Sequence, residues 1–128
     1  MALGKIKADQ LEHSTAGSLD TQYVVNGSAK ARIRYNQDTS TNVDSDNVSS
    51  YTDSSAGKSV VAFTSGMNNA TYNAITDGTN TDTGSAYDQT HSESFTSSQF
   101  QVSTGVYSTG AVTTDFVLGQ AVVFGDLA

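Results

Sequence analysis

The chain has 128 residues, a formal net charge of −7, 15% charged residues and no cysteine. This length suits one small domain, the missing cysteines exclude disulfides, and the acidic balance argues against nucleic acid as a partner. Strand-forming Thr, Val, Tyr and Phe are frequent while helix-forming Leu, Glu, Lys and Arg are scarce, so we expect an all-β protein.

Residues 1–28 are predicted to form an N-terminal arm. Its first part mixes a few apolar residues with charges and shows no regular period, apart from one short helical turn allowed at 8–12. A β-rich segment, 19–25, follows, and Asn26 and Gly27 after it form a strong turn signal. Such a polar arm is either ordered by a partner surface or a frayed terminus.

Residues 29–35 are predicted to be a strand, because apolar and basic residues alternate along them. The inward side chains are expected to be Ala31, Ile33 and Tyr35. The outward side chains are Lys30, Arg32 and Arg34, which are three of the six basic residues. This row is either a solvated face or a docking row for acidic groups of a neighbouring subunit or another surface.

The remaining chain to residue 128 alternates short apolar segments with turn residues. Strands are expected from Val48, at 59–63, at 70–76, within 94–106, at 112–116 and at 120–125, the last of these being central. Loops or turns are expected at 36–47, at Asp77 and Gly78, at 79–90 and at 108–110. Seven to nine short strands at this spacing predict a small antiparallel β-sandwich over residues 29–128.

The sequence gives little support for catalysis or metal binding. His13 and His91 both lie in polar surroundings, and no nucleophile elbow or phosphate-binding loop occurs. Glu93 and Asp115 could form a hydrolytic pair only if the fold brought them face to face. The acidic residues around 44–46 lack the spacing of a calcium loop and fit a solvated loop better. We therefore predict a non-enzymatic protein without cofactor or metal.

One loop cluster has the composition of a sugar-binding site. Tyr87 could stack on a sugar ring while Asp88 and Gln89 hold its hydroxyl groups. The alternative is that the tyrosine is a packing anchor of an ordinary surface loop.

Several short segments resemble the tail-fibre-like virion proteins of marine bacteriophages, including those of cyanobacteria. The opening phrase of that family is matched by Ile6, Lys7, Asp9, Leu11 and His13. Further similarity lies in residues 23–31, 61–72 and 122–125, although Arg32 replaces the tryptophan that is common in the family. The resemblance implies a homo-oligomer, commonly a trimer, whose arm attaches to the particle and whose β-domain projects.

These observations together predict a bacteriophage virion structural protein, made in the host cytoplasm and carried on the outside of the particle. It would be a fibre or decoration subunit whose partners are its own copies and other capsid or tail proteins. A thin core without disulfides favours such association, because ordering each residue costs about 1–2 kcal/mol. The alternative is a receptor-binding tip that contacts a host surface glycan. No apolar run reaches the roughly 20 residues of a membrane span.

Overall fold

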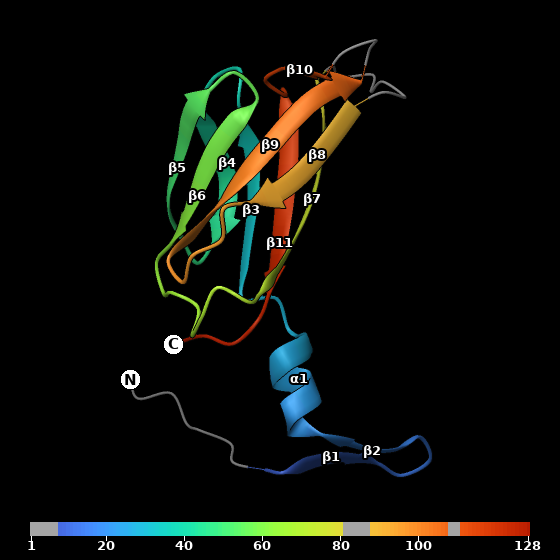
Figure 1. The fold of residues 1–128 in the computed structure, drawn as a ribbon. Coiled ribbons are helices and arrows are strands. Elements are labelled where there is room, and N and C mark those ends of the chain that lie inside the picture. Colours follow the sequence, from blue (N-terminus) through green and yellow to red (C-terminus); the bar gives the residue numbers. More distant parts are fainter. Residues whose placement is uncertain (1–7, 81–87, 108–110) are drawn as a thin grey trace.

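The computed structural model describes residues 8–80, 88–107 and 111–128, and it contains a β-sandwich preceded by a separate N-terminal segment (Figure 1). The N-terminal segment consists of β1 (Gln10–His13), β2 (Gly17–Asp20) and α1 (Thr21–Gly27). It extends from one end of the sandwich, with α1 next to the first sandwich strand (Figure 1). No helix in the described ranges is long and apolar enough to cross a membrane.

The sandwich has one sheet of four strands and one of five, and all pairings are antiparallel. The four-stranded sheet has the order β4 (Thr41–Asp46), β3 (Ala31–Asn36), β11 (Leu118–Phe124) and β7 (Asn73–Thr79). In the other sheet, β10 (Ala111–Thr113), β9 (Gln99–Tyr107), β6 (Lys58–Phe63) and β5 (Val48–Ser55) follow one another, and β8 (Asp88–Glu93) also pairs with β9. The predicted antiparallel sandwich is confirmed.

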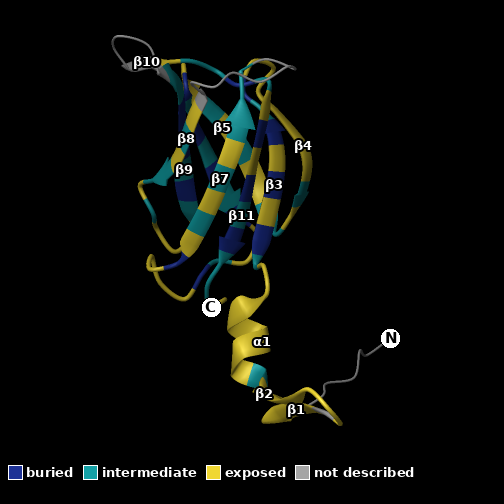
Figure 2. Cartoon of the chain, turned by 90° about the vertical axis from the view of Figure 1, so that its right-hand side faces the viewer, coloured by how far each residue is buried: buried dark blue, intermediate teal, exposed yellow. Residues whose placement is uncertain are grey.

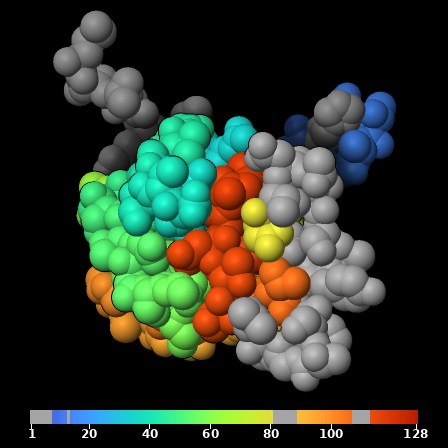
Figure 3. All heavy atoms as spheres, turned by 90° about the horizontal axis from the view of Figure 1, so that it is seen from above, coloured from blue at the N-terminus to red at the C-terminus, as the bar shows by residue number. Residues whose placement is uncertain are grey.

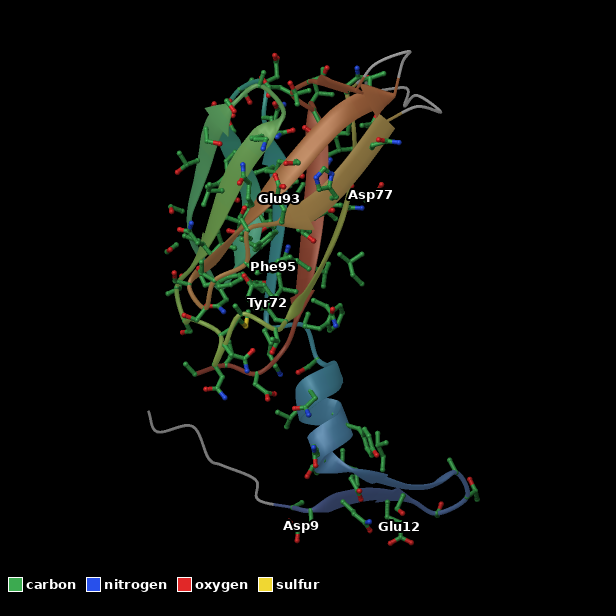
Figure 4. All side chains as sticks on the ribbon, in the orientation of Figure 1. Asp9, Glu12, Tyr72, Asp77, Glu93 and Phe95 are labelled. Atoms are coloured by element: carbon green, nitrogen blue, oxygen red, sulfur yellow. The ribbon has the colours of Figure 1, made fainter. Side chains whose placement is uncertain are left out.

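The core lies between the two sheets and is built from alternating inward side chains. Its fully covered members include Tyr35, Val61, Phe100 and Val102, each with 0% of its surface exposed. Aromatic rings fill the end nearer the arm, where the ring centroids of Tyr72 and Phe95 lie 5.1 Å apart in an edge-to-face arrangement. Figure 4 shows these two rings between the sheets. Offset and edge-to-face ring pairs stabilise a core beyond the area that they bury.

The opposite end of the core is polar and centred on Gln37, which is 1% exposed. Its side-chain Nε2 donates to Ser59 Oγ at 3.0 Å, and its Oε1 accepts hydrogen bonds from Thr104 Oγ1 at 2.8 Å and Phe116 N at 2.9 Å. The hydroxyls of Tyr51 and Ser59 lie 2.8 Å apart. Figure 3 looks onto this end, where the turn after β3 (cyan) lies against the segment before β11 (red). The amide therefore links the two sheets through satisfied buried hydrogen bonds.

The predicted secondary structure of the arm is wrong in two places. Residues 10–13 form β1 instead of a helical turn, because they pair with β2 across a turn that ends at Gly17, whose φ is +90°. Residues 21–25 are helical instead of extended, and Asn26 and Gly27 belong to the same helix. The pairing of β1 with β2 ends at Gln10 and Asp20, and the helix satisfies backbone groups of the following residues within one segment.

Within the sandwich, the strands at 29–35, from Val48, at 59–63 and within 94–106 are confirmed, and so is the central position of β11 between β3 and β7. The prediction for 70–76 is displaced, because β7 begins at Asn73. The prediction for 112–116 holds only to Thr113, where β10 ends.

Three predicted loops or turns contain strand residues. The polar segment 36–47 includes β4, which pairs with β3, and the end of the 79–90 loop belongs to β8. Asp77 and Gly78 lie inside β7, where a Cβ at Gly78 would be 2.7 Å from the Leu118 carbonyl oxygen. Gly78 thus allows a close approach of two strands instead of a turn. Residues 81–87 and the turn predicted at 108–110 lie outside the described residues.

Candidate functional site

The described part of the arm is built from a hairpin and a helix that bind each other. In the arm, β1 and β2 form a hairpin in which Leu11 faces Leu19 across the strands. Thr21 fixes the start of α1 on this hairpin, since its Oγ1 donates to the Ala8 carbonyl oxygen at 2.6 Å and its N donates to the Asp9 carbonyl oxygen at 2.9 Å. The hairpin and the helix are therefore joined into one small unit.

This unit has almost no interior of its own. Helix α1 buries no residue, and 50% of Leu11, 48% of Leu19, 66% of Tyr23 and 57% of Val25 are exposed to solvent. A lone two-stranded hairpin and a helix of seven residues are each marginal in water. The arm thus offers apolar side chains that only another surface can cover.

The charges of the arm all have one sign among its described residues. Between positions 8 and 28 it carries Asp9, Glu12 and Asp20 and has neither lysine nor arginine. Figure 4 labels Asp9 and Glu12 on the hairpin, away from the sandwich. A surface that complements the arm would combine an apolar groove with basic groups at its rim.

The structure places part of the predicted docking set on this unit. Asp9 and Leu11 are both exposed on the hairpin. His13 is the last residue of β1, whereas Ile6 and Lys7 lie outside the described residues.

The predicted basic row is divided among three environments. Lys30 Nζ donates to Ser28 Oγ at 2.8 Å and also to the Val25 carbonyl oxygen, which ties the arm to the sandwich. The guanidinium of Arg32 binds Asp44 at 2.6 Å and Asp46 at 2.5 Å on the neighbouring strand.

The hydrogen bond and charge of Arg32 lower the pKa of the Asp44 carboxyl. The acidic segment predicted as a solvated loop is therefore part of a cross-strand ion pair. Arg34 is exposed and makes no ion pair with the described residues.

A shallow depression of about 190 Å³ lies on the outer face of the five-stranded sheet, and Gln89 from the predicted glycan cluster lines it. Glu93 is its central group: Oε1 lies 3.4 Å from Lys58 Nζ and accepts a hydrogen bond from Ser103 Oγ, and Oε2 lies 3.9 Å from His91 Nε2. The bond from Ser103 and the charge of Lys58 lower the pKa of Glu93. These groups could hold several hydroxyls of a polar ligand.

The other two residues of the glycan cluster contribute less to this picture. Asp88 is the first residue of β8, and Tyr87 lies outside the described residues.

No family model, curated protein or solved structure matches this chain.

The structure gives each carboxylate of the hypothetical hydrolytic pair its own partner. Asp115 Oδ1 accepts a hydrogen bond from Gly57 N at 2.6 Å, whereas Glu93 is bound by Ser103. In the described ranges, no three or more His, Asp or Glu side chains are grouped so that they could hold a metal ion. The described residues therefore give no evidence that Glu93 and Asp115 act as a catalytic pair.

The sequence alone does not identify Leu19, Tyr23 or Lys58 as candidate site residues. Leu19 could have been found from the spacing, because Leu11 and Leu19 are equidistant from the small residues at the hairpin turn. The sequence predicts a strand at Tyr23, and Lys58 joins the depression only through the register of three strands.

Proposed function

We propose that this protein is a structural subunit of a bacteriophage virion, a homo-oligomeric fibre or decoration carried on the outside of the particle. The arm docks on a capsid or tail protein and the sandwich projects. The proposal is supported by the resemblance of the opening phrase, of which Asp9 and Leu11 are exposed on the arm. Fibres of the family that the chain resembles are commonly trimers, and we propose the same number here.

The observation that carries this proposal is the exposure of the apolar side chains of the arm. Fully burying a leucine-sized side chain stabilises a complex by about 1.5–3 kcal/mol. Leu11, Leu19 and Tyr23, each about half or more exposed, could therefore supply a large part of the affinity for a partner. The matching partner is a virion protein with an apolar groove and basic residues at its rim.

The test is retention on particles during propagation of the phage that encodes the chain. We expect the tagged wild-type protein to sediment with purified particles and the double variant Leu11→Ser, Leu19→Ser to remain in the soluble fraction. Both leucines are about half exposed, so the variant should keep the wild-type Tm.

Val43→Ser is the matched control, because Val43 is 55% exposed on the sandwich. It should leave particle retention unchanged. Equal retention of the arm variant, or absence of the wild-type protein from particles, would refute the proposal.

A second candidate function, a host-glycan receptor module, is favoured by one observation: Gln89 lines the same depression as Lys58, His91 and Glu93. A glycan array would test it, with binding expected for the wild-type protein and at least about tenfold weaker binding for Gln89→Ala. Gln22→Ala on the exposed arm is the control. An array without signal would retire this candidate.

A further inference from the structure

The outer face of the four-stranded sheet carries apolar side chains on β11 and β7, beside the charged residues of β3 and β4. Alternation along β11 places Leu118, Val122 and Phe124 on this face, and Ile75 of β7 lies beside Val122 in the register. Ile75 is 64% exposed and Leu118 is 37% exposed. Figure 2 views this face, and no described segment crosses in front of the strands. Exposed apolar side chains on an uncovered sheet face favour an interaction surface.

Two charges of opposite sign flank β11 at one level of this face, where a level is one row of residues paired across the strands. Gln120 of β11 is paired with Arg34 on one side and with Asp77 on the other. Because neighbouring strands lie about 4.8 Å apart, the backbones of Arg34 and Asp77 are separated by about 10 Å. Arg34 makes no close ion pair with the described residues, although Asp44 of β4 is paired with it in the register and its carboxyl already binds Arg32. Asp77 accepts a hydrogen bond of 3.4 Å from Gln120 Nε2.

The next level of the face is arranged differently. There Asp46, Arg32, Val122 and Ile75 follow one another across the four strands. Arg32 is neutralised within the chain by Asp44 and Asp46. The apolar residues of this level, Val122 and Ile75, are thus available to a partner, and so is Arg34 of the level that contains Gln120.

We propose that this face is the interface between copies of the chain, related by a rotation axis parallel to β11. Rotation about such an axis keeps the height of every residue along the strands, so the β3 side of one copy meets the β7 side of the next. Arg34 then lies opposite Asp77 of the next copy. Val122 packs at the axis, and Ile75 lies opposite Arg32 of the next copy, whose carbon chain offers an apolar contact. Twofold and threefold arrangements give the same pairing, and both close.

A second copy fits this face better than an unrelated partner does, because the face carries its own complement. Arg34 and Asp77 stand at equal height on opposite sides of β11. Each copy has a net charge of −7, so copies repel one another unless specific cations meet specific anions. Arg34 supplies such a cation. This inference assigns an interface to the homo-oligomer of the proposed function. It rests on that proposed function for the number of copies.

The test is a charge swap, read as solution mass by light scattering and as an association constant by sedimentation. We expect the wild-type protein to be an oligomer. Arg34→Asp and Asp77→Arg should each weaken its association at least about tenfold, and the double variant should restore it to within about threefold. Asp38→Arg, at an exposed position after β3, is the matched control and should leave association unchanged.

Ile75→Lys gives an independent measurement of association, because it changes an apolar residue beside Val122. Ile75 is 64% exposed, so the variant should fold with an unchanged circular dichroism spectrum but dissociate. A wild-type monomer at about 100 μM, or an oligomer that survives both Ile75→Lys and Arg34→Asp, would overturn the inference. An oligomer that is dissociated by these variants yet absent from particles would support this interface and refute the virion function.

Discussion

The arm and the sandwich are formed by one chain of uniform polar composition, yet they differ in how they are stabilised. The sandwich covers Val61, Phe100 and Val102 completely, whereas α1 of the arm buries no residue and Leu11 and Leu19 of the hairpin remain half exposed. Burial of apolar surface is the main favourable term in folding. The comparison teaches that the sandwich buries its own apolar surface, while the arm has almost no interior of its own.

The difference follows from which side chains the fold can bring together. Strands from distant parts of the sequence place Phe63, Tyr72, Phe95 and Phe100 in contact, with ring centroids separated by 5.1 to 6.5 Å. The described part of the arm has a single aromatic residue, Tyr23, which is 66% exposed. A segment without a second layer has nothing against which to bury an apolar face.

The largest effect is expected from removing a core ring. Phe100→Ala should lower the free energy of unfolding by about 3–5 kcal/mol, because it leaves a cavity between the sheets. Urea unfolding followed by fluorescence would measure it. Tyr23→Ala on the arm is the matched aromatic deletion and should change stability by less than about 0.5 kcal/mol. Similar losses for the two variants would contradict the comparison.

An intermediate effect is expected from the buried amide. Gln37→Leu should cost about 1–3 kcal/mol, because the buried backbone N–H of Phe116 loses its side-chain partner and the hydroxyls of Thr104 and Ser59 each lose one of two partners. Gln22→Leu makes the same change at an exposed position of the arm, and urea unfolding should show no loss for it. A Gln37→Leu protein as stable as the wild type would show that this end of the core is open to water.

The smallest effect is expected at Glu93 and should depend on pH. Its pKa in the folded protein is lowered from 4.5 by the Ser103 hydrogen bond and by Lys58. The ionised form is thus favoured by folding, which gives stability above about pH 4.5 that is lost as the pH falls through the lowered pKa.

Glu93→Gln should accordingly have a lower Tm than the wild-type protein at neutral pH, and the gap should close in acid. The effect is small because one third of the Glu93 side chain remains exposed and solvent screens its interactions. Thermal melts between pH 3 and 7 would measure it, with Glu12→Gln on the arm as control. A Tm difference between the wild-type protein and Glu93→Gln that widens in acid would show that the ionised Glu93 carboxylate does not stabilise the fold.

The sequence by itself determined those features that depend on local alternation. Residues 31–35 alternate between apolar and basic residues, and β3 accordingly buries Ala31, Ile33 and Tyr35 while Arg32 and Arg34 are exposed. The apolar segment at the end of the chain likewise predicted a central strand, which β11 is. Period-two patterning fixes which face a residue takes, and neighbouring residues suffice to show it.

The tertiary structure alone decided which segments meet. Residues 21–25 favour a strand by composition but are helical, and the pairing between β1 and β2 ends at Asp20 before them. Gln37 is buried because Ser59, Thr104 and Phe116 converge on it from positions 22 to 79 residues away. Arg34 and Asp77 share one level only through their common partner Gln120. Pairing and register depend on contacts between distant segments, and a local pattern does not contain them.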